Sequence, residues 1–152
     1  MKRLMIVGAG PFGREVLAWL KDVPAAQRTW EVAGFLDPDS AALDGYPCDL
    51  PILGEESSLC VSDHDLFICS LGDPVKKLGA CRALKSRGAA FATLIHPTAT
   101  VGPFCTIGEG HPLSRNHPDD ERYPGKLRHF ESTLDRGSRC HPGGGHHAKL
   151  PL

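Results

Sequence analysis

The chain opens with a strand, a glycine-rich turn and a helix in direct succession, and this order restricts the fold more than any other feature. In "RLMIVGAGPFGREVLAWLKDVP", residues 4–7 form a continuous apolar run, as a strand buried on both faces should. Gly8, Gly10 and Gly13 follow with G-x-G-x-x-G spacing, and apolar residues then recur at helical spacing until Pro24. Such a unit is typical of parallel sheets with right-handed helical crossovers.

Further apolar runs predict more strands of the same sheet. "EVAGFLD" ends in Asp37, and "DLFICSLGDP" leads into Gly72 and Asp73. "AFATLI" (residues 90–95) is expected to be the last strand, and the Pro- and Gly-punctuated stretch "GYPCDLPILGEESSLC" (residues 45–60) is expected to be mostly loop. The sequence therefore predicts an α/β fold, a small Rossmann-like parallel sheet over residues 1–94.

A second helix is predicted after the strand that precedes Gly72. Asp73 is a typical N-cap residue, and Pro74 suits the first helical position. The helix should continue to about Arg87, because Gly88 is a typical residue at a helix C-terminus.

The glycine loop and the Gly72–Asp73 turn both follow carboxyl ends of predicted parallel strands, where ligands bind in such sheets. A helix N-terminus offers N–H groups and a partial positive charge to a phosphate, although Pro11 removes one donor here. Asp37 has the position of an acid that binds a ribose hydroxyl or a sugar. Two plainer interpretations stay open, a tight turn without a ligand and an exposed, turn-forming Asp37.

Composition excludes several classes of function. The formal net charge is −1, so no general attraction to nucleic acid or anionic membranes is expected. No apolar run has the ~18 residues of a membrane span, and the first run ends at Gly8, too early for a signal peptide. The six cysteines form no C-x-x-C pair, which is typical of reduced residues in a cytoplasmic protein.

A six-residue repeat begins after the predicted sheet. In "IHPTATVGPFCTIGEG", Ile95, Val101 and Ile107 are spaced by six residues, and small residues follow four positions after the first two. The next position is Leu113, but polar residues and prolines then replace the pattern. Residues 95–110 are therefore interpreted as the start of a repeat that residues 111–152 do not continue.

These motifs, in this order, resemble the bacterial sugar acyltransferases of the sialic-acid O-acetyltransferase type, whose close relatives N-acetylate amino-sugar nucleotides. The resemblance is carried by "IVGAGPFGREV", "GFLD", "SLGDP" and "LIHPTATVGPFCTIGEG", and it covers residues 1–110. The sequence departs from the family's pattern at Pro11, where the family usually has a further glycine.

The resemblance implies a Rossmann-like domain that holds a nucleotide sugar or a sialic-acid-type sugar. It also implies a left-handed β-helix of hexapeptides that forms a homotrimer and binds acetyl-CoA, with no metal. The candidate sugar-nucleotide contacts that it implies are Gly8, Gly10, Gly13, Asp37, Gly72 and Asp73. The family's catalytic histidine lies in a Gly-His-Asp or Gly-His-Glu stretch, which this sequence lacks, and His96 is interpreted as structural. We therefore expect no turnover and no trimer from this chain.

The tail, residues 111–152, is expected to be disordered or out of frame. It holds most of the eight histidines and has no apolar period. Read one base late, codons for "RNHPDDER" permit "PGITLTTN", and codons for "DRGSRCHPGGGH" permit "TVGHDAILEAG", which contains the missing Gly-His-Asp. The alternative is a natural tail with a zinc site, whose candidate ligands are Cys140, His141, His146 and His147.

Two rival functions stay open for the glycine loop. A small NAD-dependent oxidoreductase would also use this loop and Asp37, but no catalytic Tyr/Lys or Cys/His constellation is apparent in the sequence. The other rival function is that of a nucleotide-binding or interaction module without catalytic activity.

Overall fold

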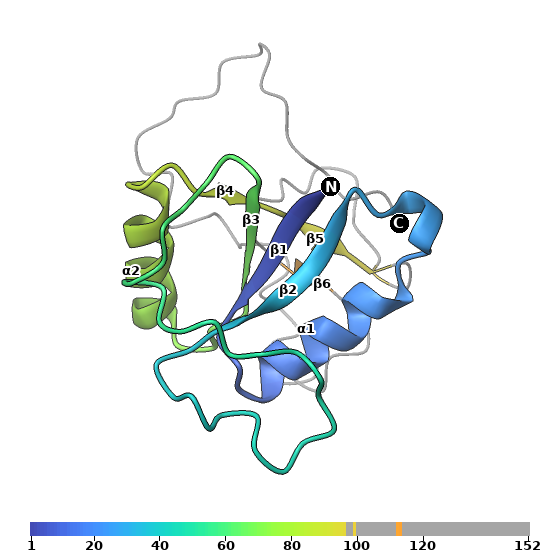
Figure 1. The fold of residues 1–152 in the computed structure, drawn as a ribbon, viewed down its shortest axis with the longest axis horizontal. Coiled ribbons are helices and arrows are strands. Elements are labelled where there is room, and N and C mark those ends of the chain that lie inside the picture. Colours follow the sequence, from blue (N-terminus) through green and yellow to red (C-terminus); the bar gives the residue numbers. More distant parts are fainter. Residues whose placement is uncertain (97–98, 100–111, 114–152) are drawn as a thin grey trace.

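A computed structural model describes residues 1–96, residue 99 and residues 112–113 (Figure 1). The remainder of the predicted repeat and tail, including the candidate zinc ligands, lies outside the described residues. The elements are β1 (Lys2–Val7), α1 (Pro11–Asp22), a short 3-10 helix (Ala25–Gln27), β2 (Trp30–Leu36), β3 (Asp65–Cys69), α2 (Pro74–Lys85), β4 (Ala90–Phe91), β5 (Leu94–Ile95) and β6 (Pro112–Leu113).

Four strands form a parallel sheet in the order β2-β1-β3-β4. The predicted α/β, Rossmann-like parallel sheet is thereby confirmed. β1 is paired on both sides, which explains why its sequence is a continuous apolar run: Leu4, Met5, Ile6 and Val7 are each at most 2% exposed.

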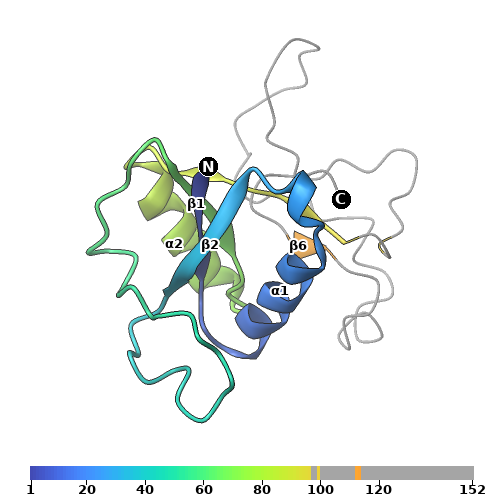
Figure 2. The ribbon, with the colours of Figure 1, turned by 45° about the vertical axis from the view of Figure 1, so that its right-hand side comes forward.

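The two helices cover opposite faces of the sheet (Figures 1 and 2). Leu4 and Ile6 of β1 pack in one cluster with Val16 and Leu20 of α1. Met5 and Val7 point the other way and pack in a second cluster with α2. This alternation follows from the two-residue period of a strand. The structure is therefore a three-layer helix–sheet–helix sandwich.

The crossover from β2 to β3, residues 37–64, contains turns but no helix along its described length. The loop predicted over residues 45–60 is part of this crossover and is confirmed. Ile52 forms an isolated parallel bridge with Phe35, so the loop returns briefly along the outer edge of β2. Before this bridge, the loop extends beyond the same end of the sheet as the glycine turn (Figure 1).

Helix α2 begins as the sequence predicts. Asp73 is its N-cap and accepts hydrogen bonds from the Val75 and Lys76 N–H groups, and Pro74 is its first residue. The helix ends at Lys85, and Gly88 follows with a φ of 85°, in the left-handed region that favours glycine.

The prediction of one strand over "AFATLI" is wrong. β4 pairs with β3, and the Ala92 N–H donates a last hydrogen bond to the Phe67 carbonyl. The chain then leaves the sheet, and β5 pairs with β6 in a separate two-stranded sheet. The apolar run does not reveal that the chain changes sheets. Phe91 and Leu94 are both buried, but they belong to different clusters of the core.

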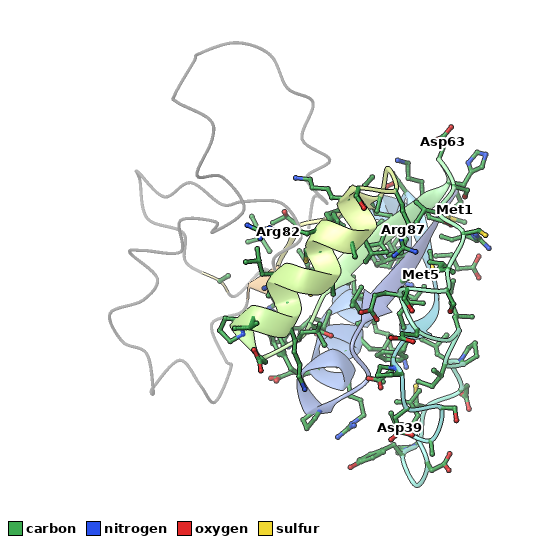
Figure 3. All side chains as sticks on the ribbon, turned by 90° about the vertical axis from the view of Figure 1, so that its left-hand side faces the viewer. Met1, Met5, Asp39, Asp63, Arg82 and Arg87 are labelled. Carbon is green, nitrogen blue, oxygen red and sulfur yellow. The ribbon has the colours of Figure 1, made fainter. Side chains whose placement is uncertain are left out.

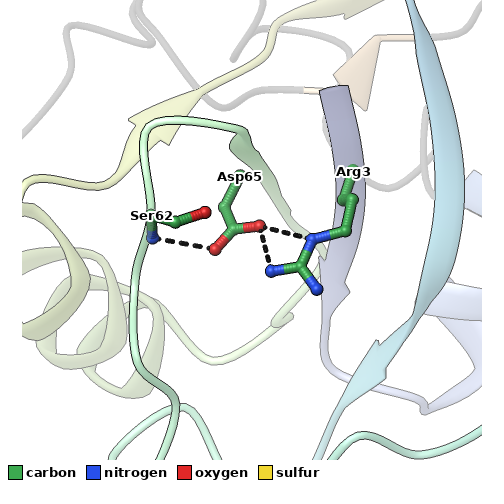
Figure 4. Close-up of polar contacts among 3 residues, drawn as sticks. All are labelled: Arg3, Ser62 and Asp65. Atoms are coloured by element: carbon green, nitrogen blue, oxygen red, sulfur yellow. Dashed lines mark hydrogen bonds and ion pairs between the residues drawn. The ribbon is translucent and has the colours of Figure 1, made fainter. Parts of the chain in front are cut away.

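Two arginines hold neighbouring segments together at the end of the domain opposite the glycine loop. Arg3 of β1 contacts the buried Asp65 carboxylate through Nε (2.9 Å) and Nη2 (2.7 Å), and Ser62 N–H donates to the same carboxylate (Figure 4). Arg87, beside the C-terminal end of α2, donates to backbone carbonyls of Glu56, Ser57 and Leu59 (Figure 3).

In the described part of the chain, no helix is long and apolar enough to cross a membrane.

Candidate functional site

The candidate site lies at the carboxyl ends of β1, β2 and β3, which meet at one edge of the sheet. The connection after β1 leads to α1 on one face, and the connection after β3 leads to α2 on the other. The two chain segments therefore diverge between β1 and β3. In open α/β sheets this divergence is the point at which ligands bind.

Two glycines of the loop serve the close contact between α1 and the sheet. Gly8 has a φ of 98° and donates its N–H to the Leu36 carbonyl at 2.8 Å. A Cβ atom on Gly13 would lie 2.0 Å from the Gly8 carbonyl oxygen. A side chain at Gly13 would therefore push α1 away from the end of β1.

Gly10 has a different role, because it faces open space. It is the N-cap residue of α1, with no side-chain cap hydrogen bond, and a Cβ atom on it would meet no atom within 4 Å. Of the three loop glycines, this one leaves room for a ligand next to the first turn of the helix.

Asp37 reaches the glycine loop, as the sequence suggests, but its contacts are with the backbone. Its Oδ2 accepts the Ala9 N–H at 2.8 Å, and its Oδ1 accepts the Asp39 N–H at 2.9 Å. Asp37 therefore joins the end of β2 to the loop that follows β1.

Ser70 is a site residue that the sequence analysis missed. Its side chain is buried, and its hydroxyl lies 2.8 Å from the Val7 carbonyl and 2.9 Å from the Gly8 carbonyl. In the sequence, the only indication of this role was that a serine directly follows the apolar run "DLFIC", whose strand ends beside the end of β1. Asp37 and Ser70 thus contact the loop from the two neighbours of β1.

Gly72 and Asp73 lie on the other side of the divergence, after β3. A Cβ atom on Gly72 would meet no atom within 4 Å, so this residue also faces open space. The Asp73 side chain accepts the Val75 and Lys76 N–H groups through Oδ1 and so caps α2.

Residues 3–82 match the family model of the PglD N-terminal domain. The chain belongs to this family. The match extends from β1 into α2 and includes the glycine loop, Asp37, Ser70 and Asp73. No curated protein matches the chain. The match therefore confirms a Rossmann-like N-terminal domain of an acetyltransferase family.

This PglD N-terminal domain carries a positive charge beside its glycine loop. Arg14, in the first turn of α1, donates from Nη1 to the Ala9 carbonyl at 3.1 Å. Its guanidinium carbon lies 3.7 Å from the centre of the Tyr46 ring, a cation–π contact with the long loop after β2. The sequence analysis missed both residues, since their contact spans the chain. The guanidinium favours an anionic ligand at this edge.

A thiol pair lies beneath the site, with Cys69 at the end of β3 and Cys81 on α2. A hydrogen bond from the Cys81 thiol lowers the pKa of Cys69 to about 7, against the effect of burial and with help from the Leu71 N–H. The same hydrogen bond, together with burial, raises the pKa of Cys81. Both residues are buried in the cluster between α2 and the sheet.

Outside this edge, few described residues suit ligand chemistry. Among residues 1–96, 99 and 112–113, no group of three or more His, Cys, Asp or Glu side chains could hold a metal ion. His96 Nε2 lies 3.2 Å from Asp22 Oδ2, and its ring lies 6.4 Å from the Trp19 ring, both on α1. These contacts agree with the structural role expected for His96.

Proposed function

We propose that residues 1–94 bind a nucleotide sugar at the edge formed by the glycine loop and the Gly72–Asp73 turn. The observation that carries this proposal is the position of Gly10, which faces open space at the N-terminus of α1 where the connections after β1 and β3 diverge. The family match over residues 3–82 supports it, because the match includes this whole edge.

The chemistry of the edge suits a diphosphate. The first N–H groups of a helix have no partner inside the helix, and they attract anions. Gly10 and Gly72 leave room for the phosphates on both sides of the divergence, and the Arg14 guanidinium adds a full positive charge. The sugar and the nucleoside would extend from the diphosphate toward the loops after β2 and β3.

We further propose that the chain is the N-terminal part of an acetyl-CoA-dependent sugar acyltransferase. Support comes from the pairing of β5 with β6, in which Leu94 pairs with Pro112 and Ile95 with Leu113, so that partners are 18 positions apart. Three hexapeptides make one coil of that length, so this spacing suits a first coil of a hexapeptide β-helix.

The proposal includes that this chain does not turn over substrate. In the resembled family a histidine takes the proton from the sugar hydroxyl or amine that attacks the thioester, a role worth about 10²–10⁴-fold in rate. The sequence contains no Gly-His-Asp or Gly-His-Glu, and one coil does not provide the stacked repeats that a solenoid needs. A one-base correction near codon 110 would restore both, along with the acetyl-CoA groove and the trimer.

Calorimetric titration separates the candidate ligands. We expect the chain to bind UDP and UDP-N-acetylglucosamine, and to bind NADH much more weakly. Preferential binding of NADH would favour the oxidoreductase, and binding of none of the three would contradict the proposal.

A second experiment tests the acyltransferase assignment. The gene is sequenced across codons 105–115, and both frames are expressed and assayed for acetyl-CoA consumption with amino-sugar nucleotides and sialic acid. Activity in the corrected frame alone is expected. Robust turnover by the 152-residue chain, or an immediate stop codon in the other frame, would contradict the assignment.

A further inference from the structure

One peptide group of the glycine loop is held at both of its ends by side chains from different strands. The group joins Gly8 to Ala9. Its carbonyl oxygen accepts the Ser70 hydroxyl at 2.9 Å, in a bond that this hydroxyl shares with the Val7 carbonyl at 2.8 Å. Its N–H donates to Asp37 Oδ2 at 2.8 Å. The carbonyl and N–H of a trans peptide point in opposite directions, so this group is fixed across the sheet, from the end of β3 to the end of β2.

The next peptide group, from Ala9 to Gly10, is held as well. Arg14 Nη1 donates to the Ala9 carbonyl at 3.1 Å, so the Gly10 N–H points in the opposite direction. No acceptor in the described part of the chain takes the Gly10 N–H. The two peptide groups before α1 are therefore held in one conformation, and the Gly10 N–H lies at the position that faces open space.

We infer that Asp37 and Ser70 are positioning residues that lock the Gly8–Ala9 peptide and so orient the Gly10 N–H toward a phosphate. The part of this inference that concerns phosphate rests on the proposed function. It departs from the expectation for Asp37, because an acid that binds ribose directs its oxygens at the ligand, whereas both oxygens of Asp37 accept backbone N–H groups.

Charge provides a further reason for this interpretation. A carboxylate beside an anion site repels the anion, so the removal of Asp37 would strengthen phosphate binding if charge were its main effect. A locking role predicts the opposite sign, because the unlocked loop must be ordered each time a ligand binds. The sign of the change in affinity therefore distinguishes the two roles.

The test begins in the absence of ligand, on the Ala9 amide proton observed by NMR. In Asp37→Ala we expect its exchange with solvent to accelerate at least about tenfold, as for loss of a hydrogen bond to a charged group. Asp39→Ala is the matched control, since Asp39 lies in the same turn and its carboxylate accepts the Ala41 N–H rather than a group of the glycine loop. Unchanged Ala9 exchange in Asp37→Ala would overturn the lock.

Titration with UDP and 2′-deoxy-UDP then separates locking from ribose binding. We expect Asp37→Ala to weaken both ligands by the same factor, about tenfold, and Asp37→Asn to have a smaller effect because its amide oxygen can still accept the Ala9 N–H. If Asp37 binds ribose, the wild type prefers UDP over the deoxy ligand and Asp37→Ala abolishes that preference. That result, or tighter binding by Asp37→Ala, would overturn the inference.

Ser70 is tested in the same way from the opposite end of the peptide. Ser70→Ala should weaken UDP binding and speed Ala9 exchange, while Ser58→Ala, which removes a hydroxyl bonded to the Glu55 carbonyl in an exposed turn, should change neither. Failure of the wild type to bind UDP would contradict the proposed function, whereas the Ala9 measurement would still decide the lock.

Discussion

A Cβ atom on Gly13 would lie 2.0 Å from the Gly8 carbonyl oxygen, and this approach joins the first turn of α1 to the end of β1. Nothing comparable limits Gly10, three residues earlier in the chain, where the same atom would meet no neighbour within 4 Å. One glycine motif thus contains residues that shape the fold and a residue that leaves space beside it. Substitutions can separate these two roles.

Gly13→Ala should destabilise the domain by about 1–3 kcal/mol, because the methyl group overpacks a backbone contact that cannot yield without moving α1. Denaturant unfolding measures the change. Gly79→Ala is the control, since Gly79 lies in α2 with no atom within 4 Å of an added Cβ. It should stabilise the domain by up to about 1 kcal/mol. Wild-type stability of Gly13→Ala would show that the close contact is not required.

Asp73→Ala should lower the free energy of unfolding by about 1 kcal/mol, because the Val75 and Lys76 N–H groups lose their acceptor at the start of α2. Asp73→Ser should retain most of the stability, since serine is also a good N-cap residue. Equal stability of the alanine and serine variants in denaturant unfolding would count against the cap.

The Asp65 carboxylate should make stability depend on pH in the acid range. Burial raises its pKa, but hydrogen bonds from Ser62 and Arg3 outweigh that effect, and the pKa is lowered from 3.8. The folded state therefore binds this proton less readily than the unfolded state. The contribution is complete above pH ~4 and is lost as the pH falls through the lowered value. Arg3→Met should shift acid unfolding to higher pH, and an unchanged midpoint would contradict this account.

The thiol pair should produce a second pH dependence at the alkaline end. The pKa of Cys69 is lowered from 9.0 to about 7, so the unfolded state binds more protons between these values and stability rises with pH there. The raised pKa of Cys81 has the opposite sign, so stability falls as the pH passes above 9. Cys81→Ala removes the hydrogen bond that lowers the pKa of Cys69. Thermal unfolding of this variant should lack the rise between pH 7 and 9, and the same rise in both proteins would refute the prediction.

Features encoded by neighbouring residues were predictable from the sequence. The apolar run of β1, the glycine turn before α1 and the Asp73–Pro74 start of α2 each depend on a few adjacent positions, and each is present in the structure. The position of Asp37 at the end of β2 was predictable for the same reason. Its partner was not, because the Ala9 N–H is brought to it by the pairing of β1 with β2.

Features that depend on strand register were not predictable. Ser70 reaches the Gly8 carbonyl only because Cys69 pairs with Val7 across β1 and β3. The break in "AFATLI" depends on pairing with residues 18 positions further along the chain. Arg14 and Tyr46 contact each other because a loop without a helix returns over α1. A single sequence carries no signal for such distant contacts.

The most direct test of nucleotide-sugar binding at this edge is calorimetric titration of UDP-N-acetylglucosamine into Gly10→Leu and Gly79→Leu. Both substitutions add the same side chain in open space, one beside the glycine loop and one on α2. We predict that both variants keep the wild-type fold, that Gly79→Leu binds like the wild type, and that Gly10→Leu loses at least about tenfold in affinity, since its side chain occupies the space next to the helix N-terminus. Equal affinities of the two variants would contradict the account.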